Sequence, residues 1–263
     1  MKIARIIYNN GTSYATVAQN TVSLINGDVF GEHKQTGTQI PLDDVTLLAP
    51  VQPRQIVAIG LNYRQHARET NKPLPDHPLV FLKGVNAVTG PNTAIVLPAM
   101  APDEVDYEAE LVIVIGKECK NVSEAQAKDC ILGYTCGIDV SARDCQNRLD
   151  RQWARAKSFD TFAPLGPWIV TDIDGDNLDI SLKLNGAVMQ ASHTSDLIFS
   201  CPFLVSYLSQ CMTLYPGSVI MTGTPSGVGA ARTPPVFLRD GDTVDVTIQH
   251  IGTLSSYVTQ EKR

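Results

Sequence analysis

Basic residues and long apolar runs are what this sequence has little of. Lys and Arg number 21 against 27 Asp and Glu, so the formal net charge is −6, and the isoelectric point is near 5.3. A chain without a basic stripe cannot neutralise a phosphate backbone, which argues against nucleic-acid binding. No apolar run approaches the roughly 20 residues that cross a bilayer. We therefore expect neither a nucleic-acid nor a membrane partner.

The N-terminus also lacks the features of a secretory signal. Met1–Arg5 runs into Ile6–Tyr8 and then into polar residues, without an apolar core or a small-residue cleavage site. The 6 cysteines include no CxxC pair, and a chain of 263 residues can bury a sizeable core without cross-links. The expected location is therefore cytoplasmic, with the cysteines reduced and mostly buried.

Common catalytic motifs are missing as well. There is no GxSxG elbow, no Gly-Lys-Ser/Thr phosphate loop and no Cys–His pair with a nucleophile signature. These absences argue against serine and cysteine hydrolases and against P-loop enzymes. The glycine-rich segment Thr222–Gly229 could hold a carboxylate with its backbone amides, or it could simply be a tight turn.

The distribution of strands and turns predicts two parts. Residues 1–50 contain short β-rich segments, and Asn10-Gly11 and Asn26-Gly27 are hairpin-turn signals. Pro50–Pro53 is typical of a linker, so we place a small N-terminal β domain at residues 1–50 and the main domain at residues 53–259. Strands and few helices follow without regular βαβ alternation, which favours the α+β class.

The main domain contains signals for a small number of helices. Asn62 is expected to be the N-cap of the first helix, Ser123 opens a capping box for the second, and Pro202 lies near the first turn of the last. The expected ranges are 63–70, 123–133, 141–153 and 202–210.

The segment Asp106–Gly116 is the most informative stretch of the chain. Its β-branched run, Val112–Ile115, closes on a glycine, which predicts a strand. Side chains alternate between the two faces of a strand, so Glu108 and Glu110 would point the same way. Two adjacent carboxylates repel each other unless a cation or a shared proton lies between them. The spacing therefore indicates a cation site.

Asp139 follows another apolar, strand-like segment and could complete an all-oxygen site. Carboxylate ligands favour Mg²⁺ or Mn²⁺, with Ca²⁺ as a substitute, over Zn²⁺. The alternative is that these alternating acids are a solvated strand face. The apolar run Leu111–Ile115 argues for burial instead, and buried carboxylates need a partner.

Three further side chains could carry chemistry. His66 and Glu69 are three positions apart on the first expected helix and share a face. A Glu that holds a His raises its basicity, which is how a general base is built. Lys157 is flanked by aromatic and proline residues and could stabilise an enolate or oxyanion. Each could equally be an ordinary surface residue.

Together these segments resemble the fumarylacetoacetate hydrolase family. The match runs in order from about Pro53 to Val258, and the N-terminal module resembles one that many bacterial-type members carry. The segments that carry the resemblance are Gly60-Leu61-Asn62-Tyr63 with His66 and Glu69, Phe81-Leu82-Lys83, Asp106–Leu111, Gly133–Asp144, Lys157-Ser158-Phe159-Asp160 and Thr222–Gly229.

The resemblance implies a strand-rich α+β fold, a mixed β-sandwich roll, that usually forms a homodimer with one divalent ion per subunit. It implies that Glu108, Glu110 and Asp139 ligate Mg²⁺ or Mn²⁺. It assigns water activation to a His66–Glu69 pair on a lid helix. It also implies that Lys157 stabilises developing negative charge. The remaining contacts to substrate carboxylate or carbonyl oxygens would come from Arg143, Gln146 and Thr224.

The expected function is a metal-dependent hydrolase that cleaves a C–C bond in a small 2,4-dioxo acid of the acylpyruvate or fumarylpyruvate type. Activated water would attack the distal carbonyl, and the metal and Lys157 would hold the leaving enolate. The same groups could instead decarboxylate oxaloacetate, or isomerise 2-hydroxyhepta-2,4-diene-1,7-dioate in aromatic catabolism. Two further alternatives are a non-enzymatic protein that binds metal and carboxylates, and a glycosidase that uses Glu108 and Glu110 as acid and base.

Overall fold

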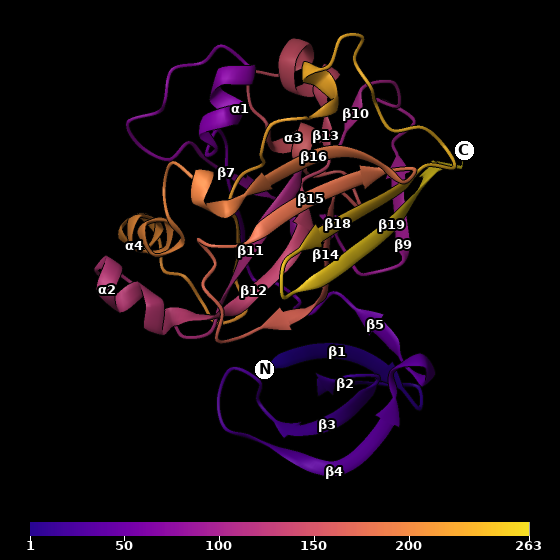
Figure 1. Cartoon of the computed structure of the whole chain (residues 1–263), viewed down its shortest axis with the longest axis vertical. Coiled ribbons are helices and arrows are strands. Elements are labelled where there is room, and N and C mark those ends of the chain that lie inside the picture. Colours follow the sequence, from indigo (N-terminus) through magenta and orange to yellow (C-terminus); the bar gives the residue numbers. More distant parts are fainter. Residues whose placement is uncertain (263) are drawn as a thin grey trace.

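The computed structural model describes residues 1–262, in which strands predominate and four α-helices lie at the periphery (Figure 1). The strands are β1 (Lys2–Tyr8), β2 (Gly11–Ala18), β3 (Thr21–Gly27), β4 (His33–Pro41), β5 (Thr46–Leu48), β6 (Ile56–Ile59), β7 (Val80–Lys83), β8 (Val88–Thr89), β9 (Thr93–Leu97), β10 (Val105–Asp106), β11 (Ala109–Ile115), β12 (Ile131–Ile138), β13 (Ser141–Ala142), β14 (Ala163–Val170), β15 (Asp179–Leu184), β16 (Ala187–His193), β17 (Val219–Met221), β18 (Thr243–Ile248) and β19 (Gly252–Gln260). The helices are α1 (Arg64–Glu69), α2 (Glu124–Ala127), α3 (Ala154–Lys157) and α4 (Cys201–Cys211). No helix within residues 1–262 is both long and apolar enough to span a membrane.

One large mixed sheet organises the molecule. Its 12 strands follow the order β4-β3-β2-β1-β14-β12-β11-β17-β6-β7, with β5 added beside β1 and β8 beside β14. The chain that leaves β7 returns to β14, where β8 pairs in parallel. The connection after β7 therefore runs back to the interior of the same sheet. The predominance of strands in mixed sheets confirms the expected strand-rich α+β class.

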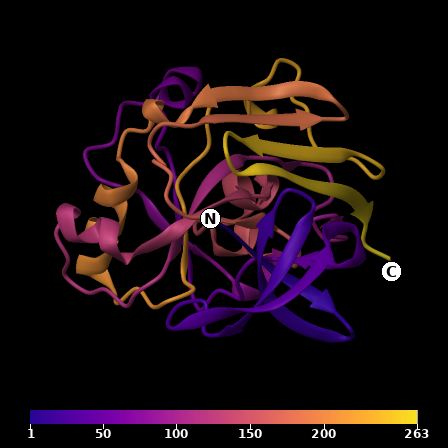
Figure 2. The same cartoon turned by 60° about the horizontal axis from the view of Figure 1, so that its bottom comes forward.

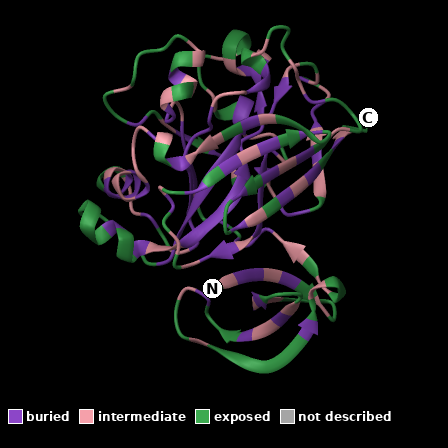
Figure 3. Cartoon of the chain, in the orientation of Figure 1, coloured by how far each residue is buried: buried purple, intermediate pink, exposed green. Residues whose placement is uncertain are grey.

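A second sheet covers this one. It has 5 strands in the order β16-β15-β18-β19-β9, and it packs over β11, β12 and β14 (Figures 1 and 2). β15 and β18 alternate buried and exposed positions, as expected for strands with one face in the core. All seven residues of β11 are buried instead, because it is a central strand covered on both faces (Figure 3).

The first strands form a separate small layer at one end of the molecule (Figure 1). β1 to β4 make an antiparallel meander around their own apolar cluster, which is formed by Ala4, Ile6, Ala15, Val17, Val22 and Ile40. Within residues 1–262 the meander pairs with β14 at Lys2–Val170 and Ile3–Ile169, and Ile3, Ile25 and Val29 pack into the main core. The boundary near residues 50–53 stays a prediction that this arrangement supports.

The helix expectations have mixed outcomes. The capping box at Ser123 and the last helix, α4, are present as predicted. Asn62 is not an N-cap, since its side chain instead binds the backbone of Phe199 and Thr222. The helix expected at 141–153 is present only in part, because Ser141 and Ala142 form β13 and pair with β10, a π turn covers Cys145–Leu149, and α3 begins at Ala154. Sheet pairing therefore displaces the helix only at its first two residues.

Candidate active site

Antiparallel pairing brings the acidic residues together. Ala109 at the start of β11 lies opposite Ile138 at the end of β12, so Glu110 and Asp139 are placed at the same edge of the sheet. Glu108 lies one residue before β11, not on the strand as predicted, because β10 ends at Asp106 and the chain bends between the two strands. Despite that bend, one oxygen from each of Glu108, Glu110 and Asp139 lies within 4.8 Å of the others.

The three carboxylates are buried, which rules out the solvated-face alternative. Glu108 is 6% exposed, and Glu110 and Asp139 are each 1% exposed. Burial of an ionised carboxylate needs compensating charge or hydrogen bonds. The surrounding side chains supply compensating positive charge and hydrogen-bond donors.

Two buried lysines and one arginine surround the acids. Lys157 Nζ lies 2.7 Å from Glu108 Oε2 and 2.6 Å from Asp139 Oδ2. Lys83 Nζ lies 2.5 Å from Asp139 Oδ1. Lys157 is only 2% exposed, so the alternative that it is an ordinary surface lysine is wrong.

Arg143 joins this cluster from the opposite side. Its Nη2 lies 2.6 Å from Glu108 Oε1 and 2.7 Å from Asp106 Oδ2. Its Nη1 donates to Gln146 Oε1 at 2.7 Å. Arg143 thereby links the acids at the start of β11 to the π turn that carries Gln146.

The pKa shifts follow from this charge arrangement. Although burial opposes ionisation, the ammonium of Lys157 and the guanidinium of Arg143 lower the pKa of Glu108 far below its usual range. Burial, followed by the charges of Asp139 and Glu108, raises the pKa of Glu110 well above its usual range. Glu110 is therefore the acid whose negative charge the protein neutralises least.

The donor set fits a hard divalent cation. When Glu110 is ionised, as it would be beside a bound cation, Asp106, Glu108, Glu110 and Asp139 outnumber the three buried cations Lys83, Arg143 and Lys157 by one negative charge. The three converging ligands are all carboxylates, a set typical of Mg²⁺ or Mn²⁺ rather than Zn²⁺. A divalent ion would turn the excess into a net positive charge, which favours an anionic substrate.

His66 and Glu69 form the expected pair on α1. His66 Nδ1 lies 2.8 Å from Glu69 Oε2, and the two side chains are 14% and 23% exposed. Glu69 Oε1 accepts a hydrogen bond from Gly227 N at 2.8 Å, which ties α1 to the loop after β17. The alternative of a loose surface contact is therefore wrong.

The loop after β17 supplies both backbone and side-chain contacts. Gly223 N donates to Glu110 Oε2 at 2.8 Å, and its φ of +100° needs a residue without a Cβ. The Thr224 hydroxyl donates to Ala109 O at 3.0 Å and accepts from Gln190 Nε2 at 2.9 Å. Thr224 thus reaches the site, but both of its contacts are already made within the protein.

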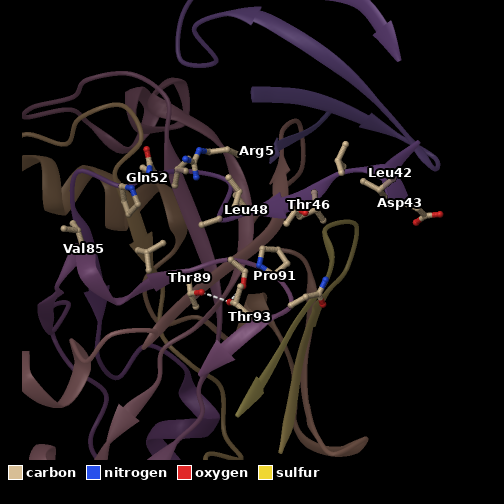
Figure 4. A pocket seen from close by; sticks show the side chains of 18 residues that line it. Arg5, Leu42, Asp43, Thr46, Leu48, Gln52, Val85, Thr89, Pro91 and Thr93 are labelled. Carbon is tan, nitrogen blue, oxygen red and sulfur yellow. Dashed lines mark hydrogen bonds between the residues drawn. The ribbon is translucent and has the colours of Figure 1, made fainter. Parts of the chain in front are cut away.

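All nine predicted side chains except Glu69 line one cavity of about 220 Å³, together with Phe81, Trp153 and Lys72. A larger cavity of about 940 Å³ lies where the N-terminal strands meet the main domain (Figure 4). Its charged lining residues are Arg5 and Asp43, one of each sign, and no group of acids converges there. Chemistry, rather than size, identifies the smaller cavity as the candidate active site.

Lys83, Asp106 and Gln190 were not singled out from the sequence. Lys83 could have been found from its place at the end of an apolar strand, and Asp106 from its period-two spacing with Glu108 and Glu110. Asp106 accepts hydrogen bonds from Gly229 N and Ala230 N, at 2.7 Å and 3.0 Å. No sequence signal pointed to Gln190, which lies on β16 of the other sheet.

The chain belongs to the fumarylacetoacetate hydrolase family. The family described as fumarylacetoacetate (FAA) hydrolase C-terminal matches residues 55–259, and an N-terminal family, Rv2993c-like, matches residues 1–50. Members of this family include hydrolases, isomerases and tautomerases, so the chain has the architecture of an enzyme.

Individual relatives agree with this assignment. Oxaloacetate tautomerase FAHD2A, mitochondrial, of Bos taurus is 46% identical over 83% of this chain and 71% of its own length. Protein Rv2993c of Mycobacterium tuberculosis is 45% identical over 99% of both chains. The crystal structure of 5-carboxymethyl-2-hydroxymuconate delta-isomerase from Mycobacterium smegmatis superposes with a TM-score of 0.90 at 45% identity, over 99% of this chain and 100% of that one.

Proposed function

We propose that the protein is a divalent-metal-dependent enzyme that interconverts the keto and enol forms of a small 2-oxo dicarboxylic acid, with oxaloacetate as the leading substrate. The observation that carries this proposal is the convergence of Glu108, Glu110 and Asp139 in a small cavity beside Lys157. The bovine oxaloacetate tautomerase at 46% identity supports the choice of reaction.

The cavity supports a compact, anionic substrate. Its volume of about 220 Å³ is below the ~300–1,000 Å³ of sites for drug-sized ligands. A four-carbon dicarboxylate therefore fits it better than a seven-carbon dienedioate. Lys72, an exposed lysine at the rim of the cavity, adds a cation that could meet the second carboxylate.

Glu108, Glu110 and Asp139 would hold Mg²⁺ or Mn²⁺. A bound ion of this kind would act as a Lewis acid towards the 2-oxo acid end of the substrate. The ammonium of Lys157 would stabilise negative charge as it develops on the enolate oxygen. Against the effect of burial, the charges of Asp139 and Glu108 raise the pKa of Lys157, which keeps this ammonium protonated.

His66 would be the base that moves the proton. With Glu69 holding Nδ1, the Nε2 atom is left free to accept a proton from the carbon next to the carbonyl. The same proton is then returned to the enolate oxygen to form the enol, or to carbon in the reverse direction. The reaction consumes no other reactant.

A second candidate is the hydrolysis of a C–C bond in an acylpyruvate or fumarylpyruvate. The His66–Glu69 pair favours it, because Nε2 could take a proton from water as readily as from carbon. Oxaloacetate decarboxylation and dienedioate isomerisation would use the same enolate stabilisation, and pyruvate release from oxaloacetate or turnover of a dienedioate would favour them over tautomerisation. We also propose a homodimer, which sedimentation would test directly.

The test follows loss of enol absorbance from oxaloacetate and, separately, from acetylpyruvate, with Mn²⁺, Mg²⁺ or excess chelator. Blanks without enzyme correct for the reaction caused by the ions alone. Pyruvate release, measured with a coupled dehydrogenase, reports decarboxylation or cleavage. Metal-dependent enol loss without pyruvate release is expected for oxaloacetate, whereas cleavage of acetylpyruvate would favour the hydrolase.

The base is tested with His66→Ala and with His77→Ala as the matched control, because His77 is an exposed histidine outside the cavity. We expect His66→Ala to lower kcat by about 100-fold or more and His77→Ala to leave it unchanged. An unchanged kcat in His66→Ala would remove this residue from the mechanism. No turnover of any substrate by the wild type would revive the non-enzymatic alternative.

A further inference from the structure

The two oxygens of each clustered carboxylate have different surroundings. Asp139 Oδ1 is held by Lys83, whereas Asp139 Oδ2 contacts Lys157. Glu108 Oε1 is held by Arg143, whereas Glu108 Oε2 contacts Lys157. In Glu110, Oε2 accepts a hydrogen bond from the backbone N–H of Gly223, and Oε1 has no hydrogen-bond partner among residues 1–262. In each acid, one oxygen is therefore secured by a donor other than Lys157.

Lys83 contacts Asp139 Oδ1 from a position outside the cavity lining. Lys157, Glu108 and Asp139 line the cavity, but Lys83 does not. The side chain of Lys83 is 0% exposed, and its Nζ also donates to Val140 O at 3.3 Å. An ammonium that reaches neither solvent nor the cavity is costly to bury. Its contacts are to Asp139 and to the backbone that follows it.

We propose that Lys83 is a positioning residue that makes Asp139 offer a single oxygen to the metal, and that it thereby favours Mg²⁺ and Mn²⁺ over Ca²⁺. Ca²⁺ takes about six to eight oxygens and often binds a carboxylate through both, whereas Mg²⁺ needs near-octahedral geometry with shorter bonds. With Oδ1 engaged by Lys83, Asp139 cannot turn both oxygens towards an ion. This inference rests on the metal dependence in the proposed function.

A simpler role for Lys83 would be to neutralise the charge of Asp139. Neutralisation and positioning predict different results, because loss of a positive charge strengthens the binding of every divalent ion by a similar factor. Loss of a positioning contact favours the ion that can use the released oxygen. The ratio of Ca²⁺ to Mn²⁺ dissociation constants therefore separates the two roles.

The experiment measures Mn²⁺ and Ca²⁺ binding to the full-length protein by calorimetry, without substrate. Wild type is expected to prefer Mn²⁺. Lys83→Met removes the donor at nearly constant length and should reduce that preference about tenfold, mainly by tighter Ca²⁺ binding. Thermal melting checks that the variant is folded, and Lys83→Gln replaces it if it is not.

Lys157→Met is the matched control, because it removes an equal charge from the cavity-side oxygen of the same Asp139. It should shift both affinities together and leave their ratio unchanged. A ratio that is unchanged in the Lys83 variant, or altered equally in both variants, would overturn the proposal. Failure of wild type to bind Mn²⁺ would instead overturn the metal dependence in the proposed function, so the two failures are distinguishable.

Discussion

At the residue scale, the site depends on buried ionisable side chains, and close partners of opposite charge offset the cost of burying most of them. Lys83 and Lys157 lie within 2.7 Å of carboxylate oxygens, so removing either partner would leave a buried charge uncompensated. Two buried tyrosines, in contrast, have polar groups without a partner in the described part of the chain. The hydroxyls of Tyr63 and Tyr107 are buried and have no hydrogen-bond partner within residues 1–262.

Tyr107 gives a prediction for alkaline pH. Burial, followed by the charge of Asp106, raises the pKa of Tyr107 to about 12, whereas the unfolded value is near 10. The folded state therefore holds this proton more tightly, and the resulting stability is complete below about pH 10 and is lost as the pH rises towards 12. Tyr107→Phe cannot lose a proton there, so its free energy of unfolding should fall less steeply, by up to ~2–3 kcal/mol over that window.

Urea unfolding at pH 7 and pH 11 would measure about half of this difference, ~1.4 kcal/mol, because pH 11 lies midway between the two pKa values. At pH 7 the variant should lie within about 1 kcal/mol of wild type, because the lost hydroxyl makes no hydrogen bond. Tyr257→Phe is the control, since Tyr257 is 47% exposed. Equal pH slopes for Tyr107→Phe and wild type would contradict the assignment.

At the element scale, the loop after β17 is fixed by carboxylates from three other segments. Gly223 N donates to Glu110 on β11, Gly227 N to Glu69 on α1, and Gly229 N to Asp106 on β10. These contacts connect the candidate metal ligand Glu110, the helix that carries His66 and the cavity wall through a single loop. A disturbance of this loop should therefore affect stability and chemistry together.

Asp106→Ala tests that connection. The substitution leaves the N–H groups of Gly229 and Ala230 without their acceptor and removes one of the two carboxylates that face Arg143. We expect the free energy of unfolding to fall by about 3–5 kcal/mol in urea titrations. Asp103→Ala, at an exposed position, should stay within ~0.5 kcal/mol of wild type. Similar losses in the two variants would show that the Asp106 contacts are not specific.

At the scale of the whole molecule, the buried charge excess couples metal binding to stability. The ligands are preassembled in the folded chain and dispersed in the unfolded one, so an ion that binds them stabilises the fold. Mn²⁺ at 100 times its Kd should add about 2.7 kcal/mol, seen as a higher Tm, and chelator should reverse the rise. Glu110→Gln should remove most of the effect. A wild-type Tm that does not respond to Mn²⁺ would contradict this coupling of metal binding to stability.

We expect two unfolding transitions in calorimetry, because the N-terminal meander has its own apolar cluster and pairs with β14 at only two of the described residue pairs. Ile3, Ile25 and Val29, which also pack into the main core, would couple the two transitions. Ile6 is buried in the small N-terminal cluster, and Ile113 is buried in the main core. Ile6→Ala should shift the lower transition and Ile113→Ala the upper one, each by the equivalent of ~2–5 kcal/mol. A single transition that both substitutions shift equally would mean that residues 1–50 and 53–259 unfold as one unit.

The sequence by itself determined the features that depend on local spacing. The apolar run of β11 predicts a buried strand, the Ser123 capping box predicts a helix start, and the three-residue interval places His66 beside Glu69. Each depends on side chains a few positions apart, where backbone geometry alone decides which face they share. The α+β class follows from the same local patterns.

Only the tertiary structure decided which acids meet, and what holds them. Asp139 joins Glu110 because β11 and β12 pair antiparallel, and Lys83 reaches Asp139 because the chain after β7 returns to β14. The late start of the helix expected at 141–153 has the same origin, since Ser141 and Ala142 pair with β10. Such contacts join residues tens of positions apart, and their energy comes from pairing and burial that no local pattern records.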